Sequence, residues 1–242
     1  MKTILSIVLV LFLFDQYCFG SELELEDADT NVSDMASLKR GAKHFLDYCA
    51  GCHSIRHLRY ARIASDFGLD EVQFRKQGLI LGKSKFLDTL EGAMHPEDSK
   101  DWMGVEPPDL SLIARAKGAD WLFTYLKTFY NDSDRPNGSN NLVSPNVGMP
   151  NVLWQLQGIQ LPIYSQRLGE EKKFERMRIV REGTMTADEF NQFINDLVGF
   201  LEYCGEPTQF QRRRVGSFVL IGLVVFAVLL FKLKNEFWRD IS

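Results

Sequence analysis

The stretch Cys49-Ala-Gly-Cys52-His53 decides how the rest of the chain is interpreted. It follows a segment, Ser37 to Cys49, whose apolar positions 38, 42, 45, 46 and 49 repeat with the spacing of one helix face. Two thiols on one helical turn can reach the two vinyl groups on one edge of a porphyrin, and the imidazole that follows can bind iron. C-x-x-C-H is therefore the attachment signature of a c-type haem. The motif predicts one haem c, bound through Cys49 and Cys52, with His53 as an iron ligand.

Two other interpretations of the motif are weaker. A redox dithiol is typical of a βαβ pattern, whereas this motif ends an amphipathic helix. A structural zinc site needs four ligands, and only Cys204 and distant histidines remain to complete one, at no recognisable spacing.

Composition excludes several classes of protein. The chain has 242 residues, enough for one domain with a sizeable core. Its 28 Lys and Arg against 32 Asp and Glu give a net charge of −4, which argues against nucleic-acid binding and permits a basic protein partner. Four cysteines are too few for a disulfide scaffold of this size.

Both ends of the chain carry apolar runs. Residues 1–20 have Lys2 ahead of a short apolar segment, which predicts a secretory signal ending at Gly20. The run Val215 to Phe231 has no charge and is flanked by Arg212–Arg214 and by Lys232 and Lys234, which is typical of a single membrane span. The signal sets the expected orientation, with residues 21–211 exported.

Between the two ends, local signals predict mostly helix and long loops. Residues 21–29 are acidic and are expected to form a mobile arm or a solvated face. Trp121 to Phe129 is expected to be helical, Asp132 to Pro150 a long loop, and 155–181 a weakly structured stretch of strand or loop. Thr186 and Glu189 form a capping box ahead of an apolar stripe at helical spacing, which predicts a final helix ending near Cys204-Gly205.

A methionine opposite the histidine would raise the reduction potential and suit an electron carrier. Met149 and Met185 are the two candidates with a suitable place in the chain. In small c-type folds the methionine loop enters the final helix, and Gly183-Thr-Met-Thr186 directly precedes that helix. This favours Met185 as the sixth ligand and leaves Met149 as the alternative.

The combined features closely resemble the cytochrome c1 family, the haem-bearing subunit of the cytochrome bc1 complex, in its bacterial form. The signal, CAGCH, EPPDLSLIARA (106–116), the GMP segment, GTM before a closing helix and one C-terminal span cover essentially the whole chain. The resemblance implies a mainly α fold: a cytochrome c-like haem domain with long loop insertions plus one C-terminal transmembrane helix.

The resemblance also implies roles for individual residues. The carbonyl of Pro108 would accept the Nδ1–H of His53, which fixes the tautomer and basicity of the ligand. Arg115, or less surely Lys117, would pair with a haem propionate. Met149 would pack near the haem.

The implied organisation has four parts. Residues 1–20 would be the signal peptide, 21–211 a periplasmic c-type haem domain, 212–234 the transmembrane anchor with basic flanks, and 235–242 a cytoplasmic tail. This places the protein in a bacterial inner membrane as a single-pass chain with its haem domain in the periplasm.

The implied partners are cytochrome b and the Rieske iron–sulfur subunit of ubiquinol–cytochrome c reductase. Electrons would arrive from the Rieske protein and leave to a soluble cytochrome c or an oxidase. No nucleophilic or proton-transfer constellation is visible, so the chain alone is expected to catalyse no bond-making reaction. The alternative is a free-standing, membrane-tethered cytochrome c that donates to a terminal oxidase, for which a flexible linker before the anchor would be expected.

Overall fold

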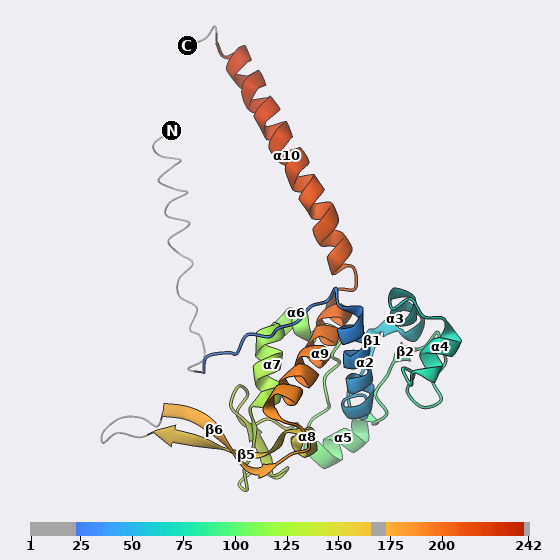
Figure 1. The fold of residues 1–242 in the computed structure, drawn as a ribbon, viewed down its shortest axis with the longest axis vertical. Helices are drawn as coiled ribbons and strands as arrows, with labels where there is room; N and C mark the ends of the chain where they lie inside the picture. The colour runs from blue at the N-terminus through green and yellow to red at the C-terminus, as the bar shows by residue number, and fades with distance from the viewer. Residues whose placement is uncertain (1–22, 166–172, 240–242) are drawn as a thin grey trace.

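The computed structural model describes residues 23–165 and 173–239. The signal predicted at 1–20 and the last residues of the predicted cytoplasmic tail lie outside these ranges. The described chain is a mainly helical domain from which one long helix extends (Figure 1). Its helices are α2 (Met35–Tyr48), α3 (Tyr60–Asp66), α4 (Glu71–Lys76), α5 (Pro96–Met103), α6 (Ile113–Lys117), α7 (Ala119–Lys127), α8 (Trp154–Gln157), α9 (Ala187–Gly205) and α10 (Gln209–Phe237).

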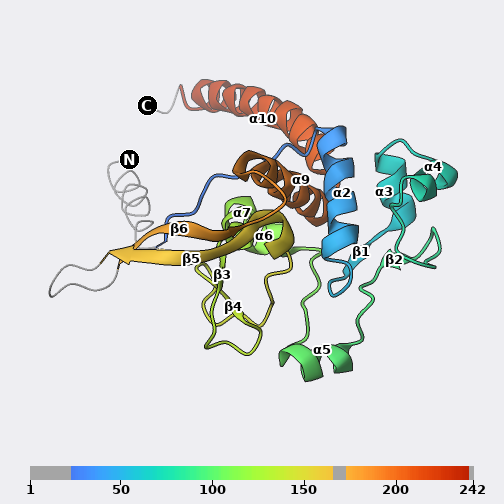
Figure 2. The same ribbon diagram turned by 60° about the horizontal axis from the view of Figure 1, so that its bottom comes forward.

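The described strands pair only as antiparallel two-stranded ribbons, so no central sheet organises the domain. The long ribbon β5–β6 projects from the side of the helices (Figure 2). In the described part of the stretch 155–181, predicted as strand or loop, residues 158–165 and 173–181 form this hairpin, whereas 155–157 belong to helix α8. The ribbons pair β1 (Ile55–Arg59) with β2 (Thr89–Leu90), β3 (Phe129–Asn131) with β4 (Ser139–Asn141), and β5 (Gly158–Ser165) with β6 (Lys173–Glu182).

The packing of α2 against α9 forms the centre of the core. Phe45 of α2 and Phe200 of α9 are buried, and their ring centroids lie 6.0 Å apart. Gly41 lets the two backbones meet, because a methyl group at this position would lie 1.9 Å from the backbone oxygen of Asp196. The helix pair therefore sets the direction in which the chain leaves α2 at the C-x-x-C-H motif.

A buried carboxylate also joins these two helices. Asp196 of α9 is 1% exposed and accepts hydrogen bonds from Arg40 Nε at 2.6 Å and from Ser37 Oγ at 2.6 Å. Burial alone would raise the pKa of Asp196, but hydrogen bonds from Arg40, Ser37 and Gln192 outweigh that effect and hold the pKa below its usual value. The carboxylate therefore remains ionised and stabilises the contact between α2 and α9.

The predicted start of the final helix is confirmed. The Thr186 hydroxyl accepts the Glu189 N–H at 3.3 Å, and the Glu189 carboxylate accepts the Thr186 N–H at 2.8 Å. This capping box satisfies backbone donors at the N-terminus of α9. The helix ends at Gly205, as predicted.

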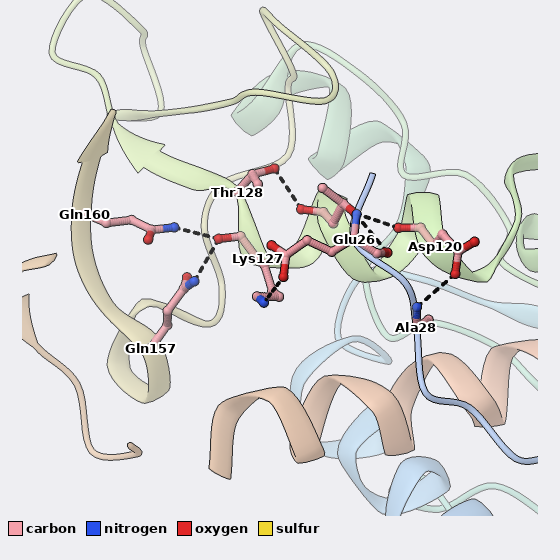
Figure 3. Close-up of polar contacts among 8 residues, drawn as sticks. Glu26, Ala28, Asp120, Lys127, Thr128, Gln157 and Gln160 are labelled. Atoms are coloured by element: carbon pink, nitrogen blue, oxygen red, sulfur yellow. Dashed lines mark hydrogen bonds and ion pairs between the residues drawn. The ribbon is translucent and has the colours of Figure 1, made fainter. Parts of the chain in front are cut away.

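The described part of the acidic N-terminal segment, residues 23–29, lies along α7 rather than apart from the domain (Figure 3). The Glu26 N–H donates to Thr124 Oγ1 at 2.8 Å, and the Ala28 N–H donates to Asp120 Oδ1 at 2.8 Å. Lys127 also forms an ion pair with Glu26. Of the two expectations for this segment, the solvated face fits and the mobile arm does not, because long-range backbone contacts attach the segment to the domain while most of its residues are exposed.

Helix α10 follows α9 after a connection of three residues, 206–208. Among the described residues, one helix is long and apolar enough to cross a membrane: Gln211–Phe237, with a mean hydropathy of 2.5 in its most apolar window. None of that window is buried inside the protein.

Candidate haem site

The C-x-x-C-H motif forms a turn that continues from the end of α2. The N–H groups of Cys49 and Ala50 donate to the carbonyl of Phe45 at 2.8 and 2.9 Å. The His53 N–H donates back to the carbonyl of Cys49 at 2.8 Å. This local folding brings both thiols and the imidazole to one side of the chain.

Residues far along the sequence support the motif from behind. The N–H groups of Ala93 and Met94 donate to the carbonyls of Ala50 and Gly51, both at 3.0 Å. Gly92 fits closely there, because a methyl group on it would lie 3.0 Å from the carbonyl oxygen of Cys52. Hydrogen bonds and close packing from a distant part of the chain therefore fix the backbone of the motif.

Cys49, Cys52 and His53 lie on the wall of one cavity of about 260 Å³. No Asp, Glu, Lys or Arg among the described residues lines it, and the wall is almost entirely apolar. The other lining residues are Tyr48 of α2; Met103 and Val105 at and after the end of α5; Pro107, Pro108, Leu110 and Ile113 around the PPDLS turn; Trp121, Leu122, Tyr125 and Leu126 of α7; Val147, Gly148, Met149, Pro150 and Val152 of the loop before α8; and Leu197 and Leu201 of α9.

The contact expected between His53 and Pro108 is present. The Nδ1 of His53 lies 2.8 Å from the carbonyl oxygen of Pro108. A proton held at Nδ1 by this carbonyl leaves Nε2 unprotonated, which is the form a metal needs. Burial lowers the pKa of His53, so the ring is neutral at neutral pH.

The PPDLS turn is fixed in place by side-chain contacts. Asp109 accepts the N–H of Arg56 through Oδ2 at 3.0 Å and the N–H of Ser111 through Oδ1 at 2.9 Å. The Leu110 N–H donates to the carbonyl of Ser54 at 2.8 Å. The carbonyl that faces His53 is therefore positioned by the turn and by strand β1 together.

The two cysteines are free thiols in the structure. Burial, and then the neighbouring Cys52, raises the pKa of Cys49 to about 12, and burial also raises the pKa of Cys52. Neither environment favours a thiolate, so it argues against a reactive dithiol. Among the described residues no group of three or more His, Cys, Asp or Glu could hold a metal ion, which argues against a zinc site there.

The structure separates the two candidate methionines. Met149 is on the cavity wall, and the Tyr125 hydroxyl donates to its Sδ at 3.4 Å. Met185 is partly buried against the hydrophobic core at the start of α9 and is not among the lining residues. Its N–H donates to the carbonyl of Leu156 at 3.1 Å.

Arg115 lies away from the cavity wall. Its Nη1 is 3.3 Å from the Glu206 carboxylate, in the connection between α9 and α10. Lys117 also lies outside the lining, over the ring of Trp121 at 5.1 Å.

Sequence reasoning missed the aromatic wall that α7 contributes. Trp121 and Tyr125 stack with centroids 4.8 Å apart and planes 11° from parallel. Burial raises the pKa of Tyr125 to about 12, so its hydroxyl remains a donor in neutral solution. The one available signal was the spacing of the two rings by four residues on one helix face, a pattern equally typical of an ordinary core.

The residues present fit a haem. An apolar cavity that carries two thiols, a neutral imidazole with its Nδ1 engaged and a thioether contains the donor set of a c-type centre. With the long apolar helix α10, the fold and the site define a membrane-anchored c-type cytochrome.

Comparison with known proteins gives the family. Residues 27–241 match the Cytochrome C1 family. The chain is 42% identical over 242 residues to cytochrome c1 of Allochromatium vinosum, covering 99% of each chain. It is 40% identical over 237 residues to a Nitrosomonas europaea protein named ammonia monooxygenase gamma subunit, covering 98% of this chain and 97% of that one. Mitochondrial cytochrome c1 of Saccharomyces cerevisiae is 25% identical over 233 residues, with 86% of this chain and 68% of that one covered.

The chain belongs to the cytochrome c1 family. It is thus a haem electron carrier with a C-terminal membrane helix, and the mainly α fold predicted for it is confirmed.

Proposed function

We propose that the chain carries one haem c, attached through Cys49 and Cys52, and passes single electrons within ubiquinol–cytochrome c reductase. The observation that carries this proposal is the shared cavity: both thiols and His53 line it, and His53 Nδ1 lies 2.8 Å from the Pro108 carbonyl. The haem supplies a reversible one-electron centre. The chain's own residues hold it and exclude water around it.

His53 is proposed as the proximal ligand, with Pro108 keeping the proton at Nδ1. The apolar wall keeps charged groups and water away from the centre, which raises the cost of an added positive charge and so favours the reduced form. His53, Cys49 and Cys52 would hold the haem for one-electron transfer to a partner, a reaction for which this chain's residues need to move no proton or group.

Met185 is proposed as the sixth ligand, with Met149 as the alternative. Met185 lies two residues before α9, and Leu197 and Leu201 of that helix line the cavity, whereas of the two methionines Met149 is the one that lines it. Met185→Leu is expected to remove the sulfur-to-iron charge-transfer band of the oxidised protein and to lower the reduction potential. Met149→Leu is expected to leave both unchanged, and the reverse result would make Met149 the ligand.

Arg115 is proposed to pair with a haem propionate, which requires it to exchange Glu206 for the haem carboxylate. Arg115 is more than half exposed and its contact with Glu206 is 3.3 Å long, so this exchange costs little. Arg115→Gln is expected to weaken the holoprotein against unfolding by less than about 1 kcal/mol. Glu206→Gln is the matched control, because it frees Arg115 without removing it.

We also propose that residues 21–211 face the periplasm, that 212–234 anchor the chain and that 235–242 face the cytoplasm. Cytochrome b and the Rieske subunit are the proposed partners, with a soluble cytochrome c as the acceptor. The similarity to Allochromatium cytochrome c1 over both full lengths supports this assembly. The three-residue connection between α9 and α10 leaves no flexible linker, which argues against the free-standing tethered cytochrome.

Purification of the tagged full chain in mild detergent tests the assembly. Co-purification of a b-type cytochrome and an iron–sulfur protein with the haem-stained chain is expected. A haem-stained chain isolated alone would favour the tethered carrier. The name of the Nitrosomonas relative suggests a second assembly, a subunit of ammonia monooxygenase, and co-purification with that enzyme would support it.

A further inference from the structure

A second cavity lies where the haem domain meets the long helix α10. Its volume is about 260 Å³, and its wall, unlike that of the haem cavity, is mostly polar. Figure 1 shows α6 and the end of α9 together at the side of the domain from which α10 extends. The lining residues are Ala114 and Arg115 of α6, Glu202 of α9, Glu206 of the connection, and Gln209, the first residue of α10. Because the apolar segment begins two residues after Gln209, the cavity lies just outside the membrane that α10 would cross.

One carboxylate of this cavity has no cationic partner among the described residues. Glu202 is partly buried and accepts a hydrogen bond from the Thr30 hydroxyl, a contact that leaves its negative charge uncompensated. Glu206, in contrast, is paired with Arg212 through both carboxylate oxygens and with Arg115 at 3.3 Å. A partly buried carboxylate without a cation favours a ligand that carries a positive charge and N–H donors.

Positive charge follows one helical turn further along α10. Arg213 comes four residues after Gln209, so the two residues share one face of the helix. Arg213 and Arg214 are exposed, and within the described part of the chain neither forms an ion pair. The helix face that begins at the cavity therefore continues with a free guanidinium about 6 Å further along the axis.

We propose that this cavity and Arg213 bind the headgroup of a phosphatidylethanolamine-type phospholipid: the ammonium enters the cavity and meets Glu202, and the phosphate pairs with Arg213. This inference rests on the proposed membrane anchoring by α10. In a bilayer the phosphate of such a lipid lies nearer the hydrocarbon than the ammonium does, and Arg213 is likewise nearer the apolar segment than the cavity is. The charges of headgroup and protein therefore match in order as well as in sign.

The chemistry of the two ends distinguishes this headgroup from other phospholipids. A choline ammonium has no N–H with which to donate to Glu202, and a glycerol headgroup has no positive charge to compensate the carboxylate. The acyl chains would continue along α10, whose most apolar window is not buried inside the protein. This apolar surface commits the site to a lipid rather than to a free phosphate ester.

The test uses the full-length holoprotein, with any subunits that co-purify, in nanodiscs of phosphatidylethanolamine, phosphatidylglycerol and phosphatidylcholine in equal parts. Mass spectrometry after mild detergent release measures which lipids remain bound, and phosphatidylethanolamine is expected in excess. Glu202→Gln keeps an oxygen for the Thr30 hydroxyl but removes the charge, and it is expected to reduce this retention roughly tenfold. Arg213→Gln is expected to reduce it by up to about fivefold.

Arg214→Gln is the matched control. It removes the same charge about 100° around the helix from Arg213 and is expected to leave the retention of phosphatidylethanolamine unchanged. Equal losses in the Arg213 and Arg214 variants, or preferential retention of phosphatidylglycerol, would overturn the inference, because a diffuse attraction to anionic lipid would then explain the binding.

The haem absorbance of the same samples shows that each variant is folded and separates the inference from the proposed function. A chain with an intact haem spectrum and no lipid preference would overturn the inference alone. A chain that does not insert into the nanodiscs would overturn the proposed anchor, and the inference with it.

Discussion

Gly41→Ala tests the close contact between α2 and α9, which sets the position of the C-x-x-C-H motif at the end of α2. The added methyl group would lie 1.9 Å from the backbone oxygen of Asp196, whereas ordinary carbon–oxygen contacts are about 3.3 Å. The obstacle is backbone, so the helices must move apart by about 1.4 Å. Such overpacking lowers the free energy of unfolding by ~3 kcal/mol at the upper end of its usual range. The higher helix propensity of alanine relative to glycine offsets ~1 kcal/mol of this loss. The net loss is therefore ~2 kcal/mol.

The assay is thermal unfolding of the detergent-solubilised holoprotein, followed by haem absorbance. A loss of ~2 kcal/mol predicts that Tm falls by ~4–8 °C for a domain of this size. Gly199→Ala is the matched control on α9, because its methyl group would meet Thr30 Cβ at an ordinary 3.8 Å. It is expected to leave Tm unchanged or to raise it. Equal Tm values for the two variants would refute the close-approach argument.

Three further predictions concern the rest of the chain. The pKa of Asp196 is lowered in the folded protein, so its contribution to stability is present above the unfolded pKa of about 3.9 and is lost as the pH falls through the lower folded value. Tm measured against pH in acid should show this loss. Asp196→Asn should lower Tm at pH 7 and make Tm less dependent on pH in acid. Thr124→Val removes the acceptor for the Glu26 N–H. Hydrogen exchange of the Glu26 amide is therefore expected to become faster, with Tm nearly unchanged. An unchanged exchange rate would mean that other contacts hold residues 23–29 on the domain. Inserting about ten Gly and Ser residues at 206–208 should leave haem attachment intact and, in the proposed reductase complex, slow electron arrival at the haem. An unaltered rate would contradict the argument that the short connection between α9 and α10 holds the haem domain rigidly at the membrane.

Local signals accounted for the parts of the fold that were predicted correctly. The capping box at Thr186 and Glu189 needs only residues three apart, so the start of α9 was visible in the sequence. Likewise, the apolar spacing before Cys49 predicted α2, and the uncharged run after Arg214 predicted α10. The three elements that carry and anchor the site were thus encoded locally.

The missed features depend on contacts between distant residues. The acidic composition of the N-terminal segment predicted a mobile arm or a solvated face. Composition does not reveal that the Glu26 N–H donates a hydrogen bond to Thr124, 98 residues away. The predicted propionate partner Arg115 pairs with Glu206, a contact that depends on how α6 packs beside α9. Met149 was expected near the haem, but the contact of its sulfur with Tyr125 depends on a loop folded onto α7. No local pattern contains such information.

The most direct test of the account is mass spectrometry of the purified full-length chain after proteolysis, with a pyridine haemochrome spectrum of the intact protein. The account predicts one haem on the peptide that contains Cys49, Cys52 and His53, and a spectrum in which both vinyl groups have been consumed. Unmodified Cys49 and Cys52 in the mature protein, or a haem that acid–acetone extracts from it, would contradict the central claim.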